Sequence, residues 1–159
     1  MEKIYGTDKA QNGLVKAGRK WIVFYGFYKD PNTGSGYEYR HTFSEKPTLA
    51  QVKSIIISQI NSDIDGKILS GFVWRGMPVW LSSENQFNYK AAYDLAVQTG
   101  GASLPVRFKF GTDDEPQYHT FSDLQEFADF YTSAMAFVNG TLNDGWAEKD
   151  AIDWSVYDV

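Results

Sequence analysis

Residues 69–100, with the sequence LSGFVWRGMPVWLSSENQFNYKAAYDLAVQTG, constrain the fold more than any other part of the chain. Two short apolar runs, Phe72–Trp74 and Met77–Leu81, are separated only by Arg75-Gly76. Because glycine reaches positive φ without a steric cost, this pattern predicts a tight hairpin turn. Ser82-Ser83 then provide a helix N-cap, and a pair of glycines ends the helix that follows. The stretch therefore predicts a β-hairpin that leads directly into a helix.

The same order of elements is expected on both sides of this stretch. His41-Thr42-Phe43-Ser44 recurs as His119-Thr120-Phe121-Ser122. Each copy ends the second of two strand-like runs that a turn-rich segment separates. Thr48 and Ser122 are the expected N-caps of the two helices that come next. Common ancestry of the two units explains the repeat, and so do the shared demands of a strand-to-helix junction. The sequence predicts an α+β fold with two antiparallel β-hairpin–helix units joined by a central hairpin and helix.

The expected domain organisation follows these units. Residues 1–20 are polar and contain three glycines, which predicts a flexible arm or one that a partner orders. Residues 21–66 form the first hairpin–helix unit, because Asp65-Gly66 is expected to end its helix. Residues 67–159 form the second hairpin–helix domain, with a short helix at 142–149 and an acidic C-terminal tail. Asp65–Ser70 is the expected boundary, and one domain or two remains an open alternative.

Acidic residues are concentrated near the C-terminus, which bears on the class of partner. Residues 112–159 contain 11 Asp or Glu and one basic residue, Lys149. Such a region repels polyanions, so no nucleic-acid partner is expected. No segment approaches the roughly 20 apolar residues of a membrane span, and the N-terminus lacks the apolar core of a secretory signal. We therefore expect no membrane partner and synthesis in the cytoplasm.

Few side chains suit catalysis. The absence of cysteine excludes disulfides, zinc–thiolate sites and thiol nucleophiles. The two histidines, His41 and His119, show no metal-ligand spacing and are expected to be ordinary strand residues. Asp113-Asp114-Glu115 offers carboxylates to calcium, but Pro116 follows it and a solvated hairpin loop is the better interpretation. No phosphate-binding loop or nucleophile motif is present. We predict that the protein is not an enzyme and has no catalytic residue, metal site or cofactor.

Four of the five tryptophans, together with Arg75, are the best candidates for contact with a partner. Trp74 and Trp80 flank the predicted turn at Arg75, where they would meet a protein partner or stack on a sugar. A core role is the alternative for both, because a helix follows closely. Trp146 and Trp154 lie in the acidic C-terminal region and are expected to anchor it to the core or to a partner. The candidate partner-binding residues are therefore Trp74, Arg75, Trp80, Trp146 and Trp154.

The segment LSGFVWRGMPVWLSSENQFNYKAAYDLA resembles an uncharacterised phage-protein domain family. Three features carry the resemblance: the Met-Pro-x-Trp-Leu element at residues 77–81, the strand LPVRFKFG, and a helix ending in the turn Val138-Asn139-Gly140-Thr141. The resemblance covers residues 69–157 and extends more weakly to the first strand and helix. The family is found in phages and prophages of gut Bacteroidales, and related domains occur beside tail-fibre genes.

The resemblance implies a bacteriophage structural or assembly role. The leading hypothesis is a tail or tail-fibre-associated virion protein that docks onto other phage structural proteins and onto further copies of itself as a homo-oligomer. Its localisation would be the virion, after synthesis in the cytoplasm of the infected bacterium. The alternatives are a tail-fibre assembly chaperone that is absent from the mature virion and a module that binds host glycans.

Overall fold

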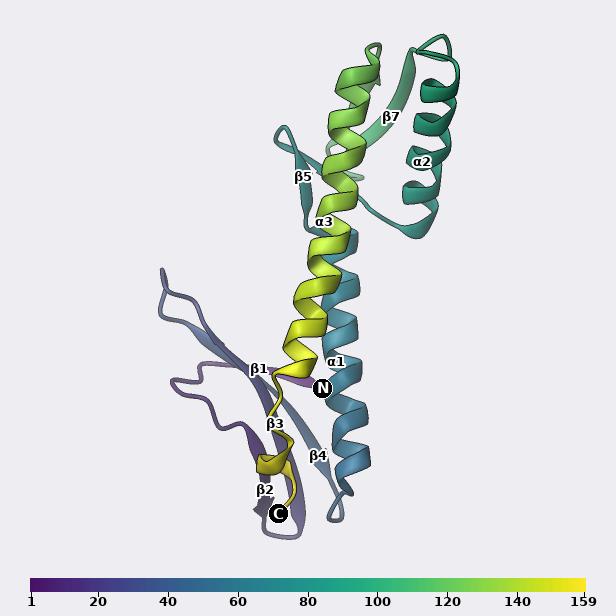
Figure 1. Cartoon of the computed structure of the whole chain (residues 1–159). Helices are drawn as coiled ribbons and strands as arrows, with labels where there is room; N and C mark the ends of the chain where they lie inside the picture. The colour runs from purple at the N-terminus through teal and green to yellow at the C-terminus, as the bar shows by residue number, and fades with distance from the viewer. The chain divides into compact units, whose positions relative to one another are not determined.

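Three hairpins, each followed by a helix, form most of the chain in the computed structural model, which describes all of residues 1–159 (Figure 1). This order confirms the expected α+β fold. The strands and helices are β1 (Glu2–Tyr5), β2 (Gly13–Ala17), β3 (Lys20–Lys29), β4 (Gly36–Phe43), α1 (Leu49–Ser70), β5 (Phe72–Trp74), β6 (Met77–Val79), α2 (Ser83–Gln98), β7 (Val106–Gly111), β8 (Pro116–Phe121), α3 (Leu124–Asp150) and the short 3-10 helix η1 (Trp154–Tyr157).

The chain divides into two compact units, and the division does not fall where it was expected. Unit 1 comprises residues 1–61 and 148–159, whereas unit 2 comprises residues 62–147. The expected boundary at Asp65–Ser70 is wrong because α1 continues through Gly66 to Ser70. A helical glycine costs only about 1 kcal/mol relative to alanine. Ile64 is buried before Gly66, and the partly buried Ile68 packs against the core of unit 2 after it.

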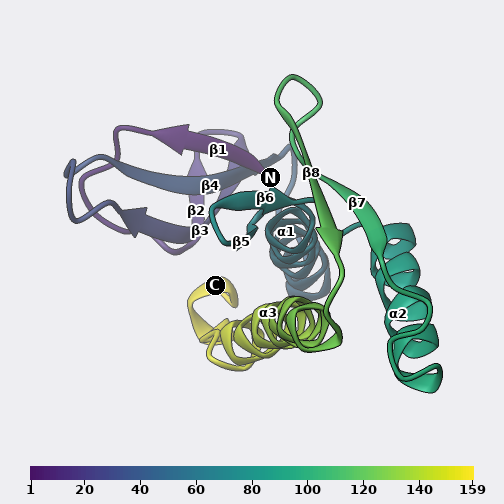
Figure 2. The same cartoon turned by 90° about the horizontal axis from the view of Figure 1, so that it is seen from above.

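The first 20 residues are not an arm, because they supply both edge strands of the sheet in unit 1. The strand order is β1-β4-β3-β2, and all neighbours are antiparallel (Figure 2). β1 pairs with β4 from Glu2↔Arg40 to Tyr5↔Tyr37, and β2 pairs with β3. β1 has only four residues and β2 only five, and polar, glycine-containing segments surround them, so the local sequence resembles a linker. Their partner strands provide the hydrogen bonds that order them.

The hydrophobic core of unit 1 lies between the sheet, α1 and the C-terminal helix η1. Its buried apolar residues come from the sheet, from the first half of α1 and from η1: Leu14, Val23, Tyr39, Val52, Ile56, Ile60 and Tyr157. The Tyr157 hydroxyl donates to the Phe24 carbonyl oxygen at 3.0 Å. Burial, and then the charge of Glu38, raise the pKa of Tyr157 to about 12. Tyr157 therefore fixes the end of the chain to β3.

Unit 2 has an aromatic core to which both of its hairpins and the helices α2 and α3 contribute. The core contains Phe72, Trp74, Val79, Leu81, Tyr89, Ala96, Phe110, Phe121, Phe127, Phe130 and Ala134. Phe121 stacks on Phe127 with ring centroids 4.7 Å apart, which joins β8 to α3. Tyr89 of α2 meets Phe108 of β7 edge-to-face at 4.9 Å. Such ring pairs contribute beyond the apolar area they bury, typically by about 1 kcal/mol each.

The helix ends confirm two predicted caps and correct two other predictions. Thr48 and Gln51 form a capping box, and Ser82 accepts from the Asn85 N–H at 3.2 Å. The cap of α3 is Asp123 rather than Ser122, because the Asp123 carboxylate accepts from the Glu126 N–H. The helix expected at 142–149 is the last part of α3, since Asn139-Gly140 does not interrupt the helix. No helix is both long and apolar enough to cross a membrane.

Candidate binding surface

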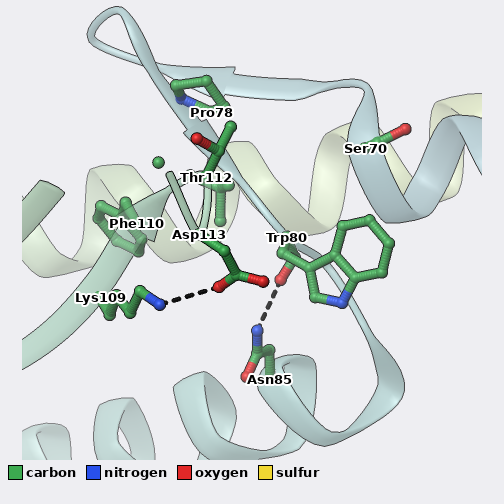
Figure 3. Close-up of a pocket in the computed structure, with 10 residues that line it drawn as sticks. Ser70, Pro78, Trp80, Asn85, Lys109, Phe110, Thr112 and Asp113 are labelled. Atoms are coloured by element: carbon green, nitrogen blue, oxygen red, sulfur yellow. Dashed lines mark hydrogen bonds and ion pairs between the residues drawn. The ribbon is translucent and has the colours of Figure 1, made fainter. Parts of the chain in front are cut away.

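A pocket in unit 2 opens beside Trp80, between the end of β6 and the turn that follows β7 (Figure 3). Its volume is ≈ 480 Å³, within the range of small-molecule sites. The buried side chains of Val79 and Phe110 supply apolar surface. The other lining residues are Ser70, Pro78, Trp80, Asn85, Lys109, Gly111, Thr112 and Asp113. The pocket therefore combines an apolar interior with a polar rim.

One side of the pocket is shaped by the β7–β8 turn. Gly111 has φ +78°, and a Cβ there would lie 2.3 Å from the Glu115 carbonyl oxygen, so only glycine fits. The Thr112 N–H donates to the Glu115 carbonyl, and the Glu115 N–H donates to the Thr112 hydroxyl. Lys109 Nζ pairs with Asp113 Oδ1 at 3.0 Å. The hydrogen bond from Lys109 to Asp113 and the charge of Asp113 raise the pKa of Lys109.

The opposite side is formed by Trp80 and Asn85. The Trp80 side chain is 52% exposed, so much of its indole ring remains open to solvent. Asn85 Nδ2 donates to the Trp80 carbonyl oxygen at 2.8 Å, which ties the strand end to the first turn of α2. Trp80 therefore stays a candidate for contact with a partner, and its backbone is held in place.

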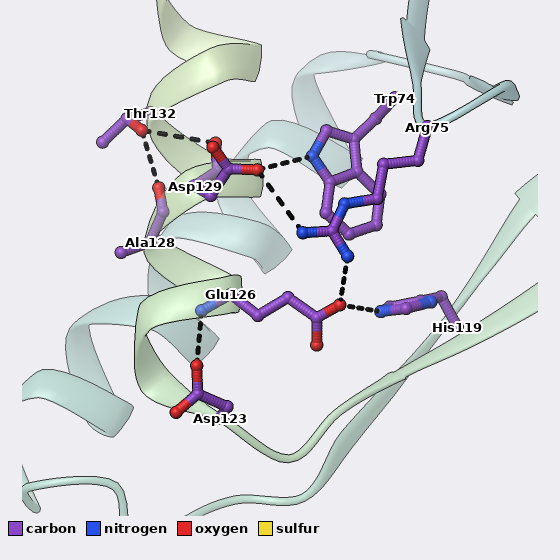
Figure 4. A network of polar contacts seen from close by, with 8 residues as sticks. All are labelled: Trp74, Arg75, His119, Asp123, Glu126, Ala128, Asp129 and Thr132. Carbon is purple, nitrogen blue, oxygen red and sulfur yellow. Dashed lines mark hydrogen bonds and ion pairs between the residues drawn. The ribbon is translucent and has the colours of Figure 1, made fainter.

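Trp74 and Arg75 hold the β5–β6 turn in place (Figure 4). Burial leaves Trp74 unavailable to a partner, whereas Arg75, whose side chain is half exposed, stays a predicted partner-binding residue. Trp74 is only 4% exposed, and its Nε1 donates to Asp129 Oδ2 at 3.2 Å. The Arg75 guanidinium lies over the Trp74 ring at 4.4 Å and pairs with Glu126 Oε1 at 2.6 Å. Arg75 has φ 49° and Gly76 φ 80°, as a two-residue hairpin turn of the predicted kind requires. These contacts fasten the β5–β6 turn to the first turns of α3.

The two C-terminal tryptophans have different surroundings. Trp146 of α3 is 56% exposed, so it offers surface to a partner. Trp154 of η1 is half-buried, with Lys53 Nζ 5.2 Å from its ring and Tyr157 6.0 Å away. The buried anchor of the C-terminus is Tyr157, which the sequence analysis did not select.

The two histidines lie in different units and pack against aromatic rings. His41 meets Phe43 at 4.7 Å, and His119 meets Phe121 at 4.6 Å, both edge-to-face. His119 Nε2 also lies 3.3 Å from Glu126 Oε1. The repeated His-Thr-Phe-Ser segment therefore has matching local geometry in β4 and β8. No group of three or more His, Cys, Asp or Glu side chains is arranged to hold a metal ion.

The geometry leaves the function open, and comparison with known proteins supplies the family. Residues 51–159 match the family model described as a domain of unknown function, DUF4376. The chain belongs to the DUF4376 family. The expected resemblance to an uncharacterised domain is thereby confirmed, whereas its association with phages stays a prediction. The Trp80 pocket and the Trp74–Arg75 network both lie inside the DUF4376 domain, whereas β1–β4 precede it. No curated protein and no solved structure matches the chain.

Sequence reasoning missed two features of the DUF4376 domain. The first is the set of polar residues that faces Trp80, because Lys109 and Thr112 come close to Asn85 only in the folded chain. The second is an exposed apolar stripe on α2, where Phe87 is 69% and Leu95 is 51% exposed. The stripe consists of Phe87, Ala91 and Leu95, which are four residues apart and therefore lie along one face of the helix. The sequence could have predicted this stripe, because placing Tyr89 and Ala96 on the buried face of the helix puts Phe87 and Leu95 on the opposite face.

Proposed function

We propose that this DUF4376 protein is a non-enzymatic bacteriophage structural protein that works by docking onto other proteins of the same particle. Its place would be the tail or a tail fibre, and its localisation the virion. Two lines of reasoning support the proposal: the resemblance to a phage-protein family, and the exposed apolar stripe of α2, defined as Phe87, Ala91 and Leu95. The stripe is the observation that carries the docking mechanism.

The stripe is available for a partner because folding does not use it. α2 packs against its own unit through Tyr89 and Ala96, which are buried on the opposite side of the helix. Phe87 projects a large apolar ring into solvent, and full burial of such a side chain is worth about 1.5–3 kcal/mol. The ion pair Lys90–Asp94 borders the stripe. An apolar centre beside polar residues is typical of protein interfaces.

The surroundings of the ionisable residues also favour a non-enzymatic role. His119 packs among Trp74, Phe110 and Phe121, and its imidazole faces Glu126. Glu126 in turn pairs with Arg75. Arg75 and Glu126 pair with each other, and the His119 ring packs among aromatic side chains, so folding explains their positions with no substrate required.

The acidic C-terminal third offers a second means of specificity. Some of its acids have partners within the chain, such as Asp144 with Lys67 and Asp113 with Lys109. Asp150 and Asp158 add to the negative charge of this end, and so does Asp153, whose carboxylate accepts hydrogen bonds from Ser155 and caps η1. Charge complementarity at an interface directs orientation and encounter more than affinity. A basic surface on the neighbouring phage protein would fit this end.

Quantitative mass spectrometry of purified particles from the phage or prophage that encodes the chain tests the proposal. A structural protein appears at a fixed copy number per particle and withstands high-salt washing. Absence from particles, together with binding to unassembled fibre protein in infected cells, would replace the proposal with the assembly-chaperone alternative. Absence from both would contradict a phage structural role.

A further inference from the structure

We propose that the pocket beside Trp80 binds a neutral saccharide. The inference rests on the shape and chemistry of the pocket and does not depend on the docking function proposed above. Sugars present an apolar face of C–H groups and an edge of hydroxyl groups. The pocket offers surface complementary to each.

The apolar part of the site consists of one exposed ring and two buried side chains. Trp80 presents half of its side-chain surface to solvent, while Val79 and Phe110 are nearly inaccessible and form the apolar interior. A half-exposed indole is a large, rigid surface that loses little conformational entropy when a ligand covers it. The C–H face of a sugar ring stacks on such a surface.

The polar part of the site surrounds this apolar surface. Figure 3 shows Lys109 and Asp113 on one side and Trp80 with Asn85 on the other. Asn85 Nδ2 uses one hydrogen on the Trp80 carbonyl, which leaves its other hydrogen and Oδ1 for a ligand. Thr112 and Ser70 also line the pocket. The Thr112 hydroxyl accepts from the Glu115 N–H and keeps its own hydrogen for a ligand, whereas the Ser70 hydroxyl donates to the Gly66 carbonyl oxygen and can only accept. Together these groups provide both donors and acceptors, as neighbouring sugar hydroxyls require.

The charges in the pocket favour a neutral ligand. Lys109 and Asp113 form an ion pair, so the rim carries one positive and one negative charge. A phosphate would meet the Asp113 carboxylate, and a cationic ligand would meet the Lys109 ammonium group. Hydroxyl groups suit both, because each hydroxyl can donate to Asp113 or accept from Lys109.

The site is also formed in advance of binding. The hydrogen bond from Asn85 holds the Trp80 backbone, and the turn after Gly111 holds Thr112 and Asp113. Neither side requires a rearranged backbone to meet a ligand. Preorganisation of this kind lowers the cost of binding a small polar molecule.

The experiment is a titration followed by two-dimensional NMR of the whole ¹⁵N-labelled protein. The probes are glucose, galactose, mannose, N-acetylglucosamine, their short oligomers and an array of neutral glycans. Trp80→Phe identifies the indole N–H signal of Trp80. We expect at least one probe to shift this signal saturably. Trp80→Ala should abolish binding, and Asn85→Ala or Asp113→Asn should weaken it about tenfold, as loss of one good hydrogen bond does.

Matched variants separate binding from folding. Phe87→Ala changes an exposed aromatic residue outside the pocket and should leave saccharide affinity unchanged. Thermal unfolding checks that the pocket variants stay folded, as the exposure of Trp80 leads us to expect. The proposal is overturned if no neutral glycan binds or if Trp80→Ala binds as tightly as the wild type. None of these outcomes bears on whether the protein is found in virions, so the two proposals fail separately.

Discussion

Three glycines inside the long helices have different surroundings, so the same substitution should have opposite effects. A Cβ at Gly66 or Gly140 would meet nothing within 4 Å. A Cβ at Gly145 would lie 2.0 Å from Ile64 Cδ1 and 2.7 Å from its Cγ1. Gly66→Ala and Gly140→Ala should each raise the free energy of unfolding by roughly 0.5–1 kcal/mol. Gly145→Ala should lower it by about 1 kcal/mol, because Ile64 must move.

Urea unfolding of the three variants under identical conditions makes this comparison. Gly66→Ala serves as the control for helix propensity, since Gly145→Ala gains the same propensity but loses packing. A Gly145→Ala protein as stable as Gly66→Ala would show that α1 and α3 do not approach closely at Ile64.

Tyr89 predicts how the stability of the protein changes in alkali. Burial raises the pKa of Tyr89 from 10 to about 12. The unfolded chain therefore loses this proton at lower pH than the folded one. The contribution of Tyr89 is complete below pH 10 and should fall by up to about 2.7 kcal/mol as the pH rises to 12. Unfolding by denaturant at pH 9 and pH 11 measures the loss.

A substitution assigns the alkaline effect to one residue. Tyr89→Phe removes the titrating hydroxyl and keeps the ring, so it should flatten this part of the pH dependence. Tyr157→Phe is the comparison, because burial also raises the pKa of Tyr157 to about 12. An unchanged pH dependence in Tyr89→Phe would contradict the assignment.

At the scale of elements, the segment that joins β1 to β2 depends on one buried carboxyl group. β1 and β2 lie at opposite edges of the sheet, so residues 6–12 connect the two edges. Glu38 of β4 is fully buried, and its Oε1 accepts from the N–H groups of Gln11 at 2.8 Å and Asn12 at 3.2 Å. Glu38→Ala should lower the stability of unit 1 by about 1–3 kcal/mol, because two backbone N–H groups in partly buried hydrogen bonds lose their acceptor and the space of the Glu38 side chain is left empty.

Amide hydrogen exchange locates the effect of this substitution. The N–H groups of Gln11 and Asn12 should exchange faster in Glu38→Ala, while the amides of α2 in unit 2 keep their wild-type rates. Glu38→Gln keeps an acceptor oxygen and should show a smaller change. Equal protection of Gln11 in the wild type and in Glu38→Ala would refute this explanation of how the segment is held.

The elements that were predicted correctly are those whose signals are local. The turn at Arg75-Gly76 and the caps at Thr48 and Ser82 each follow from a few neighbouring residues. β1 and β2 were missed because each has only four or five residues, too few for a clear strand pattern. Their strand conformation depends on hydrogen bonds to β4 and β3, which lie elsewhere in the sequence. The break expected at Gly66 does not occur, since burial of apolar residues along α1 outweighs the local preference of glycine.

The candidate site was predictable only in part, for a related reason. Trp80 was selected from its place beside the turn, and the structure leaves it half exposed. Trp74 lies on the same face of the hairpin as the buried Phe72 and Val79, so it points into the core. Trp80 follows Val79 directly and therefore points to the other face, because successive side chains of an extended chain alternate. Lys109 and Asp113 lie 29 or more positions away from Trp80 in the sequence. Only the packing of unit 2 brings them to one pocket.

At the scale of the whole molecule, the family match and the two units divide the chain differently. The DUF4376 match begins at residue 51 and includes the C-terminal residues 148–159, which belong to unit 1. The four-stranded sheet precedes the match, yet Tyr157 from the matched region hydrogen-bonds to β3. Unit 1 therefore combines a sheet outside the family model with a C-terminal segment inside it.

The most direct test of docking through the α2 stripe is the amount of this protein in purified virions after substitution of Phe87. Phage carrying Phe87→Ser should incorporate markedly less protein than wild-type phage, because an exposed apolar anchor is lost without harm to the fold. Val73→Ser, which removes a comparably exposed apolar side chain on β5 and outside the stripe, is the matched control and should be incorporated normally. Absence of the wild-type protein from virions, or equal incorporation of Phe87→Ser and wild type, would contradict docking through the α2 stripe.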